Sequence, residues 1–455
     1  MQKNKAFQPD FKLTPGTLGE AIQQAIEIEI ATIPVYLYTY YSINRTPNQQ
    51  QIITDVSAAL VKQGKPEAEA KKEAEEISAS IMVFANKAGA LIMSVAIEEM
   101  LHMALSSNLK QSLVGLPELV GKTPKTWPAY LPGHEPEFPI NKGRLSLPQL
   151  MTFLEIESPS PLPDKTKLLK AIPYKTIGQF YDMIVQYIEH NELAYNKDAP
   201  QLIPGKGYYA QNNVDTIFYD KHHKPHLVND ADSGDLVLVE DRASALKAIH
   251  IIVEQGEGNQ DAPGLNPDYT VNCSISPADY DDPAMKEFSH FEKFSRIYCH
   301  YDFLTKKFAG FGMEEKQFAG YFVQNVALNP VTADYPANIQ TLSNLLNAIY
   351  TYIFVMSEGC YKKAGHTQYE IFMFGIHKSM IFILNSLCGD IMQQTYTDKK
   401  DGLTYKAAPT FEDYAFDPAS SPKSQLIALH AEVVKVFPGE AYLGQRFQDL
   451  PDVAL

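Results

Sequence analysis

The chain has 455 residues, of which 45% are hydrophobic and 20% charged, the balance of a folded globular protein with room for two or three domains. Its net charge of −15 excludes the basic surface that nucleic-acid binding requires. The N-terminal segment lacks the apolar core of a signal peptide, and no run of about 18 apolar residues predicts a membrane span. A cytoplasmic protein with neither nucleic-acid nor membrane partners is therefore expected.

The first predicted helix covers residues 14–43, where apolar side chains recur at a spacing of three to four residues. Thr14 and Pro15 suit its start. Glu29 falls on the apolar stripe, and a carboxylate that faces a core needs a partner or a metal ion. Pro34 is expected to kink the helix just beyond this glutamate.

A second long helix is predicted over residues 66–113, and it carries Glu99 and His102 near its end. The proline-rich segment that follows, residues 116–175, includes a short predicted helix at 147–157. Long loops inside a domain are usually functional. This segment is therefore expected to cover a pocket and to set the choice of substrate.

The rest of the chain is predicted to be mostly helical, apart from a mixed region at residues 203–240 with a hairpin near its end. Residues 1–308 are taken as one domain with insertions at 116–175 and 196–240, and residues 309–455 as a C-terminal helical domain. The further predicted helices lie at 176–195, 241–256, 277–308, 336–359, 366–396 and 421–436.

Two copies of Glu-x-x-His lie in the helices predicted at 66–113 and 277–308. An i, i+3 pair directs a carboxylate and an imidazole off one helix face. Two such pairs and one lone Glu from each of two other helices make the ligand set of a di-iron or di-manganese four-helix bundle. The predicted metal ligands are Glu29, Glu99, His102, Glu254 or Glu257, Glu287 and His290.

The third carboxylate is left open between Glu254, which continues the face of His250, and Glu257, which lies between two glycines. Glycines allow close backbone approach, but they also simply end helices. Glu98 has the wrong spacing for the pair and is expected to be solvated. A single buried His is usually a hydrogen-bonded core residue, so the complete ordered set carries the prediction of an all-α, ferritin-like four-helix bundle.

The chain resembles the ferritin-like domain of the iminophenyl-pyruvate dimer synthase family over residues 14–305. This family includes domains of the large synthases of violacein, rebeccamycin and staurosporine biosynthesis. The resemblance implies a ferritin-like bundle with non-haem iron, and in the pigment pathways oxidative coupling of two imines made from aromatic 2-oxo acids. It rests on Glu29-Ile30-Ala31-Thr32-Ile33-Pro34 with Tyr36-Leu37-Tyr38, Glu98-Glu99-Met100-Leu101-His102-Met103, Phe153-Leu154-Glu155-Ile156-Glu157-Ser158-Pro159, Gln255-Gly256-Glu257-Gly258, and Ser289-His290-Phe291 with Phe294.

The chain departs from that family in two respects. It lacks the very long additional region of those synthases, and it carries an amide, Gln179, where relatives tend to carry Glu.

Three functional hypotheses follow from the ligand set. The first is an oxidoreductase in which two iron ions (or manganese, since carboxylate and imidazole suit both) use dioxygen to oxidise a small organic substrate, such as an amino acid or derived imine of secondary metabolism. The second is a scaffold in which zinc or manganese only holds the bundle together. The third is a metal-free helical scaffold whose carboxylates pair with cationic side chains.

The remaining features bear on assembly and on redox state. Aromatic-rich stretches after residue 310 are expected to form core or a subunit interface, which is compatible with a homo-oligomer. The cysteines form no Cys-x-x-Cys pair and are expected to be reduced thiols in the cytoplasm. They are Cys273, Cys299, Cys360 and Cys388.

Overall fold

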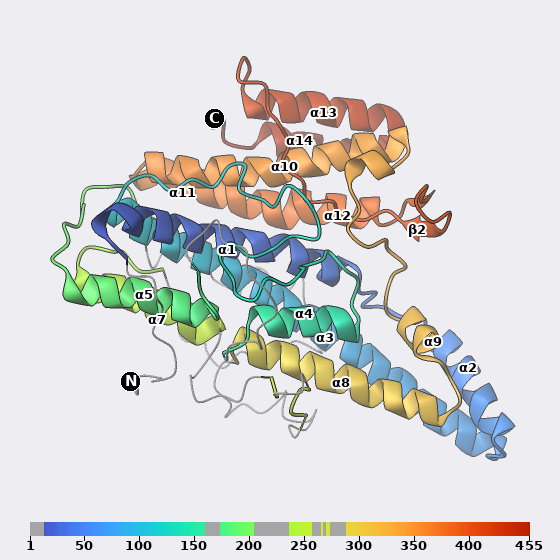
Figure 1. Ribbon diagram of the computed structural model, residues 1–455. Coiled ribbons are helices and arrows are strands. Elements are labelled where there is room, and N and C mark those ends of the chain that lie inside the picture. Colours follow the sequence, from blue (N-terminus) through green and yellow to red (C-terminus); the bar gives the residue numbers. More distant parts are fainter. Residues whose placement is uncertain (1–12, 160–172, 204–235, 257–264, 267–269, 274–287) are drawn as a thin grey trace.

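The helices lie in three layers, with the two longest in the middle (Figure 1). These two are α1 (Pro15–Tyr41) and α3 (Glu67–Leu113), which pack along one another, and α2 (Gln49–Lys62) packs against α3. Shorter helices cover one side of this pair, and a C-terminal layer covers the other. This computed structural model describes residues 13–159, 173–203, 236–256, 265–266, 270–273 and 288–455.

The two central helices begin and end close to the residues expected from the sequence. At the start of α1, Thr14 and Thr17 form a capping box, and Pro15 occupies the first helical position, where its missing N–H is not needed. Pro34 lies inside α1 without ending it. The helix α2 was not predicted, since its sequence is short and polar on most of its surface.

Two short pairs of helices together form the layer beneath α1 and α3. One pair is α5 (Ile177–His190) with α7 (Arg242–Gly256), and the other is α4 (Leu147–Ile156) with α8 (His290–Gly310). In Figure 1 the pairs lie toward opposite ends of the central helices. The ends of these short helices therefore meet near the middle of the molecule. In a four-helix bundle of full-length helices, the interiors of helices would lie there instead.

The helix predicted at 277–308 begins later than expected. The structure starts α8 at His290, where the Ser289 side chain accepts a hydrogen bond from the backbone N–H of Glu292 and the Glu292 carboxylate accepts one from the Ser289 N–H. This capping box fixes the N-terminus of the helix. The second Glu-x-x-His motif is thus not carried by one helix, and Glu287 lies outside the described residues.

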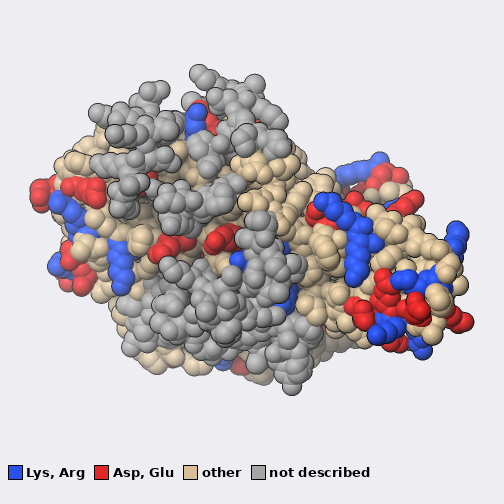
Figure 2. Space-filling view, turned by 90° about the horizontal axis from the view of Figure 1, so that it is seen from below, with Lys and Arg blue, Asp and Glu red and all other residues tan. Residues whose placement is uncertain are grey.

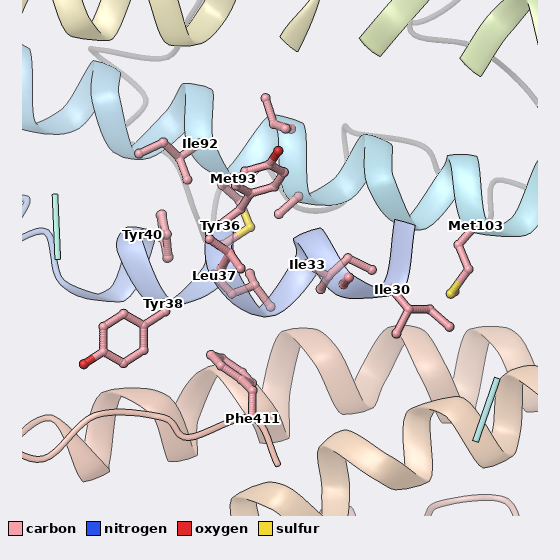
Figure 3. Packing of buried hydrophobic residues seen from close by; sticks show 14 of the residues in the cluster. Ile30, Ile33, Tyr36, Leu37, Tyr38, Tyr40, Ile92, Met93, Met103 and Phe411 are labelled. Atoms are coloured by element: carbon pink, nitrogen blue, oxygen red, sulfur yellow. The ribbon is translucent and has the colours of Figure 1, made fainter. Parts of the chain in front are cut away.

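The C-terminal layer packs on α1 from the side opposite α4 and α8. One continuous cluster of buried apolar side chains joins the layers, and Figure 3 shows α1 residues between α3 and the C-terminal helices, with Phe411 beside them. The helices of this part are η3 (Thr332–Asp334), α10 (Ala337–Lys362), α11 (Gly365–Glu370), η4 (Ile371–Ile376), η5 (Ser379–Leu384), α12 (Asn385–Ile391), α13 (Pro422–Val436), η6 (Pro438–Leu443) and α14 (Gly444–Gln448). The short helix α9 (Glu315–Gly320) packs against α8 instead.

Strands occur at a different place from the one predicted. Residues 236–240 are extended without pairing into a strand, and residues 204–235 lie outside the described part. An antiparallel hairpin forms instead from β1 (Thr395–Thr397) and β2 (Thr404–Lys406), with Tyr396 opposite Tyr405.

Two helical stretches are long and apolar enough to cross a membrane, by length and composition alone. They are Glu67–Leu113 and Gly365–Ile391, and 78% and 56% of their apolar windows are buried inside the protein. On the face that Figure 2 shows, acidic and basic side chains are interspersed at the end of the molecule where α2 and α9 lie.

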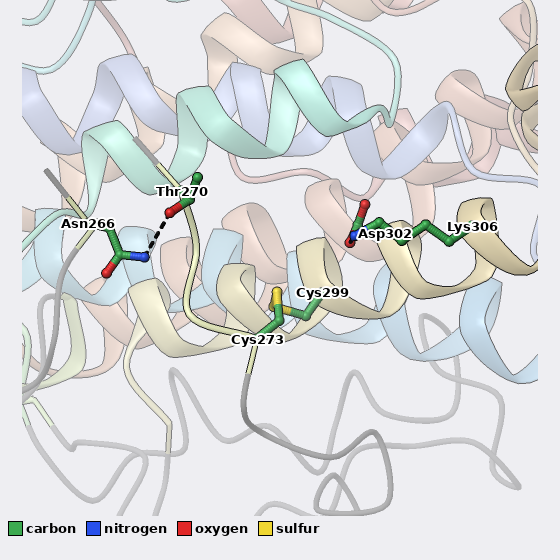
Figure 4. The surroundings of a disulfide bond; sticks show 6 residues. All are labelled: Asn266, Thr270, Cys273, Cys299, Asp302 and Lys306. Carbon is green, nitrogen blue, oxygen red and sulfur yellow. Dashed lines mark hydrogen bonds and ion pairs between the residues drawn. A yellow bond between two sulfur atoms is a disulfide. The ribbon is translucent and has the colours of Figure 1, made fainter. Parts of the chain in front are cut away.

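The expectation that all cysteines are reduced thiols is wrong for one pair. Cys273 and Cys299 form a disulfide that ties the segment before α8 to the middle of that helix (Figure 4), whereas Cys360 and Cys388 are free and buried. The two half-cystines are 26 residues apart, and neither lies in a pattern that predicts pairing.

Replacing Cys299 with Ser is expected to lower the free energy of unfolding by about 2–4 kcal/mol, because the bond closes a loop that otherwise adds entropy to the unfolded chain. Urea unfolding without reductant measures this loss. Reductant should bring the wild type to the stability of Cys299→Ser and leave the variant unchanged. Equal stability of the two oxidised proteins would contradict the expectation.

Candidate metal centre

Glu99 lies at the centre of a buried group of carboxylates and imidazoles on the inner face of α3. Its Oε1 is 3.0 Å from Nδ1 of His290, and its Oε2 is 4.0 Å from Nδ1 of His102. The two imidazole rings stack with centroids 5.2 Å apart. The ligand atoms of these three residues all lie within 4.8 Å of one another. One carboxylate therefore faces two imidazoles, each through a different oxygen.

His102 forms one half of the group together with Glu29 from α1. Its Nε2 is hydrogen-bonded to Oε1 of Gln255, at the end of α7, over 2.9 Å. Because an amide oxygen only accepts, Nε2 carries the proton and Nδ1 keeps its lone pair. That lone pair points toward Glu29, whose Oε2 is 3.8 Å away, too far for a hydrogen bond.

His290 forms the other half in a matching way. Its Nε2 lies 2.9 Å from Oε2 of Glu98, which also accepts hydrogen bonds from Lys293 Nζ at 2.6 Å. Its Nδ1 lies 3.5 Å from Oε2 of Glu157 but makes no well-aligned hydrogen bond within the described residues. Both imidazoles thus have Nε2 fixed from outside and Nδ1 directed into the group.

A tyrosine hydroxyl holds the outer carboxylate in each half. Tyr181 from α5 donates to Oε1 of Glu29 over 2.6 Å, and Tyr36 from α1 donates to Oε1 of Glu157. In each case the second oxygen, Oε2, is left facing an imidazole. Burial, followed by the charge of the partner carboxylate, raises the pKa of both tyrosines well above its usual value, so both hydroxyls keep their protons.

The pKa values of the carboxylates and imidazoles in this group are shifted in different directions. Burial and the charge of Glu99 raise the pKa of Glu29 and of Glu157 above the usual range. Burial also works against ionisation of Glu99, but the adjacent imidazole of His290 holds its pKa at about 2. Burial lowers the pKa of His102 to about 4. The surrounding carboxylates raise the pKa of His290 against the effect of its burial.

The donor set fits a dinuclear metal centre. Nδ1 of His290 is a buried polar atom that faces two carboxylates without a well-aligned hydrogen bond, and a cation between them would satisfy all three groups. The outer partners of the two imidazoles are of the kind that orient metal-bound histidines. One ion would be held by His102 and Glu29, the other by His290 and Glu157, with Glu99 shared between them.

The structure places the predicted ligands unequally. It brings four of them together, all with side chains no more than 4% exposed: Glu29, Glu99, His102 and His290. It does not bring Glu254 to the group, because that side chain is 69% exposed and pairs with His250 on the outer face of α7. Glu257 and Glu287 lie outside the described residues.

Two residues were misjudged at the sequence level. Glu157 was not proposed as a ligand, since it follows α4 as its C-terminal cap and no helical spacing points to it. The only signal was the string Phe153–Pro159 that carries the family resemblance. Glu98 was expected to be solvated, yet its side chain is 2% exposed between His290 and Lys293. Spacing from Glu99 gave no indication of a partner on another helix.

The described residues of the proline-rich segment reach both the C-terminal layer and the site. Its residues 116–146 run along α1 toward the C-terminal layer, where Thr123 contacts Tyr350 and Lys142 donates to the carbonyls of Pro330 and Thr410. Among the described residues of the segment, Glu157 at the end of α4 belongs to the site. The prediction that this segment selects the substrate is untested.

The Lys293 to Met change is expected to lower the free energy of unfolding of the metal-free protein by about 3–5 kcal/mol, because it leaves the Glu98 charge buried without its ammonium partner. Urea unfolding gives the value. The double variant Glu98→Gln, Lys293→Met removes both charges and should recover much of the loss. If the double variant is as unstable as Lys293→Met, the loss comes from packing and not from the charge.

The comparisons with known proteins concern the family and the fold. A family model described as Ferritin-like matches residues 22–299, more than half of the chain. A solved structure of a ferritin-like protein from Caulobacter vibrioides is 18% identical, with 82% of this chain and 96% of that chain covered and a TM-score of 0.42. None of the curated proteins matches. The family match confirms the prediction of an all-α, ferritin-like bundle.

Proposed function

Because the chain belongs to the ferritin-like family, whose bundles commonly hold iron between their helices, we propose that it is a dinuclear-metal oxidoreductase that uses dioxygen. The observation that carries the proposal is the paired arrangement around Glu99. Two imidazoles direct Nδ1 and two outer carboxylates direct Oε2 toward the same space, and other side chains hold the opposite atoms of all four groups.

The protein's own part in the reaction is to position, to hold protons and to exclude water. The protonated hydroxyls of Tyr36 and Tyr181 keep one oxygen of each outer carboxylate occupied, so that only the other is open to an ion. Gln255 and Glu98 fix the two rings. Two bound iron ions would supply the electrons that reduce dioxygen, chemistry that no side chain provides.

The substrate class rests on the resemblance to the iminophenyl-pyruvate dimer synthases. We extend that resemblance to propose a small organic substrate, an amino acid or an imine derived from one. The strings that carry it include five of the residues that the structure brings together: Glu29, Glu99, His102, Glu157 and His290. Gln179, the departure from the family, lies in the first turn of α5 and donates its backbone N–H to Thr176.

Oxygen consumption after anaerobic loading with ferrous iron tests the proposal. Wild type freed of metal and reloaded should take up dioxygen in a burst, faster than free ferrous iron at the same concentration. Glu99→Gln should show no burst, and Glu254→Gln, changed on the outer face of α7, should behave as wild type. Metal binding without oxygen uptake by any of these proteins would favour the non-catalytic metal scaffold and overturn the oxidoreductase.

Turnover with added substrate is the second stage of the same experiment. Aromatic amino acids, and mixtures of aromatic 2-oxo acids with ammonia, are offered to the loaded protein. Uptake of dioxygen beyond the initial burst, with one of these compounds consumed, supports the substrate class. A burst that none of them prolongs would leave the metal chemistry and remove the proposed substrates.

A further inference from the structure

An apolar cavity of about 90 Å³ lies between the central helices and the C-terminal layer. Helix α1 contributes Ile33, Leu37 and Tyr41, and α3 contributes the stripe Met93, Ile97 and Met100. These positions recur every three or four residues, so each helix presents one continuous face to the cavity. The remaining walls come from α10 and from the helix that follows it.

The wall that faces α1 and α3 has an unusual backbone. Residues 371–376 and 379–384, η4 and η5, are both π-helical. Single π-turns are rare and are found mostly at functional sites, because the wider turn displaces side chains from the usual helical spacing. Six residues of this stretch line the cavity: Phe372, Ile376, His377, Met380, Ile381 and Leu384. Two consecutive π-segments against one cavity indicate a wall shaped for a ligand.

All but one of the polar side chains that line the cavity form hydrogen bonds with other residues of the protein. Tyr41 donates to Asn385, Tyr350 pairs with Thr123, and Ser357 donates to the carbonyl of Ile353. His377 makes no hydrogen bond within the part of the chain that the structure describes, and its burial lowers its pKa below the usual value. A neutral imidazole therefore remains as the one uncommitted polar group of an otherwise apolar wall.

The cavity is elongated along the helices. Its lining on α1 extends from Ile33 to Tyr41, about 12 Å at roughly 1.5 Å per residue. Methionines from α3 and η5 adapt to the shape of what they contact, which suits a flexible ligand. An apolar lining of this length with a single uncommitted polar group suits a linear chain with one polar end.

We propose that this cavity binds a linear alkyl chain of medium length that carries one terminal oxygen group, with the chain between α1, α3 and η5 and the oxygen at His377. This site is separate from the metal centre. The residues that line the cavity include Met100 and Met103 of α3 but none of the grouped residues Glu99, His102 and His290. The proposal therefore does not depend on metal binding.

Calorimetric titration with decanoic acid, decanol and a short control acid, butyric acid, tests the proposal on the full chain. The two long compounds should bind with one site per chain, and butyric acid should bind at least about tenfold more weakly, since it leaves most of the apolar wall uncovered. Glu99→Gln, which changes the metal centre, should bind the long compounds as wild type does. No binding of either long compound to wild type overturns the proposal.

A pair of adjacent substitutions locates the site. Ile381→Trp fills the cavity and should weaken the binding of decanoic acid at least about tenfold. Phe382→Trp changes the next residue, an exposed ring against Arg446, and should bind decanoic acid as wild type does. Ile381→Phe is the milder filling if the first variant does not fold. Wild type should bind decanoic acid more tightly than an alkane of the same length, which has no terminal oxygen. His377→Phe should bind the two with equal affinity. Equal affinity of Ile381→Phe and wild type would place the ligand elsewhere.

Discussion

Glu99→Gln is expected to lose both metal ions, whereas Glu157→Gln and Glu29→Gln are each expected to lose one. The reason is geometric, because Glu99 faces both imidazoles and each outer carboxylate faces only one. Inductively coupled plasma mass spectrometry on proteins reloaded with ferrous iron should find about two ions per wild-type chain. The Glu99 variant should retain almost none.

The matched control for this series is Glu254→Gln, which alters an exposed glutamate of α7 and should keep the wild-type metal content. The series also decides between the sequence-based ligand set and the structural one. Full metal content in Glu157→Gln would show that the third carboxylate is not the one at the end of α4. A loss in Glu254→Gln would show that α7 turns that side chain inward.

Glu29→Gln is expected to make the metal-free protein more stable at pH 8 by on the order of 1–3 kcal/mol, while it weakens metal binding. Burial and the charge of Glu99 raise the pKa of Glu29 above its value in the unfolded chain. A folded-state pKa raised in this way gives stability that is fully present below about pH 4.5 and is lost as the pH rises through the folded pKa. A glutamine side chain does not ionise, so the variant does not lose this stability as the pH rises.

Urea unfolding of chelator-treated protein at pH 5 and pH 8 measures this difference. The gain from Glu29→Gln should be larger at pH 8 than at pH 5, and Glu254→Gln should show no such change. Ferrous iron should stabilise the wild type more than the variant, since ligand binding adds to the stability of the state that binds. A variant that is less stable than wild type at pH 8 would falsify the account of Glu29 as a carboxylate whose burial opposes its ionisation.

Helical periodicity predicted the elements whose apolar faces are long and regular. The bounds expected for α1, α3, α7 and α13 differ from the observed ones by only a few residues. Periodicity also placed Glu29 and the pair Glu99 and His102 on inward faces, where the structure has them. These residues lie within long helices, so their direction follows from spacing alone.

Helical periodicity could not predict the direction of side chains at helix ends. Glu157 caps α4 and His290 is the first residue of α8, so the direction of each side chain depends on a turn and not on a period. Glu254 was one of two candidates for the third carboxylate because it continues the face of His250, but that face is exposed. The Cys273–Cys299 pairing likewise depends on how the chain returns to α8, which no local pattern encodes.

The same turn of α3 contributes Glu99 and His102 to the metal centre and Met100 and Met103 to the apolar cavity. Anything that shifts this turn acts on both sites at once. Thermodynamic linkage makes any such effect reciprocal. If a molecule in the cavity changes the affinity for metal by some factor, bound metal changes the affinity for that molecule by the same factor. Titrating the cavity ligand with and without bound metal measures this factor, and equal affinities of Glu99→Gln and wild type for the ligand correspond to a factor of one.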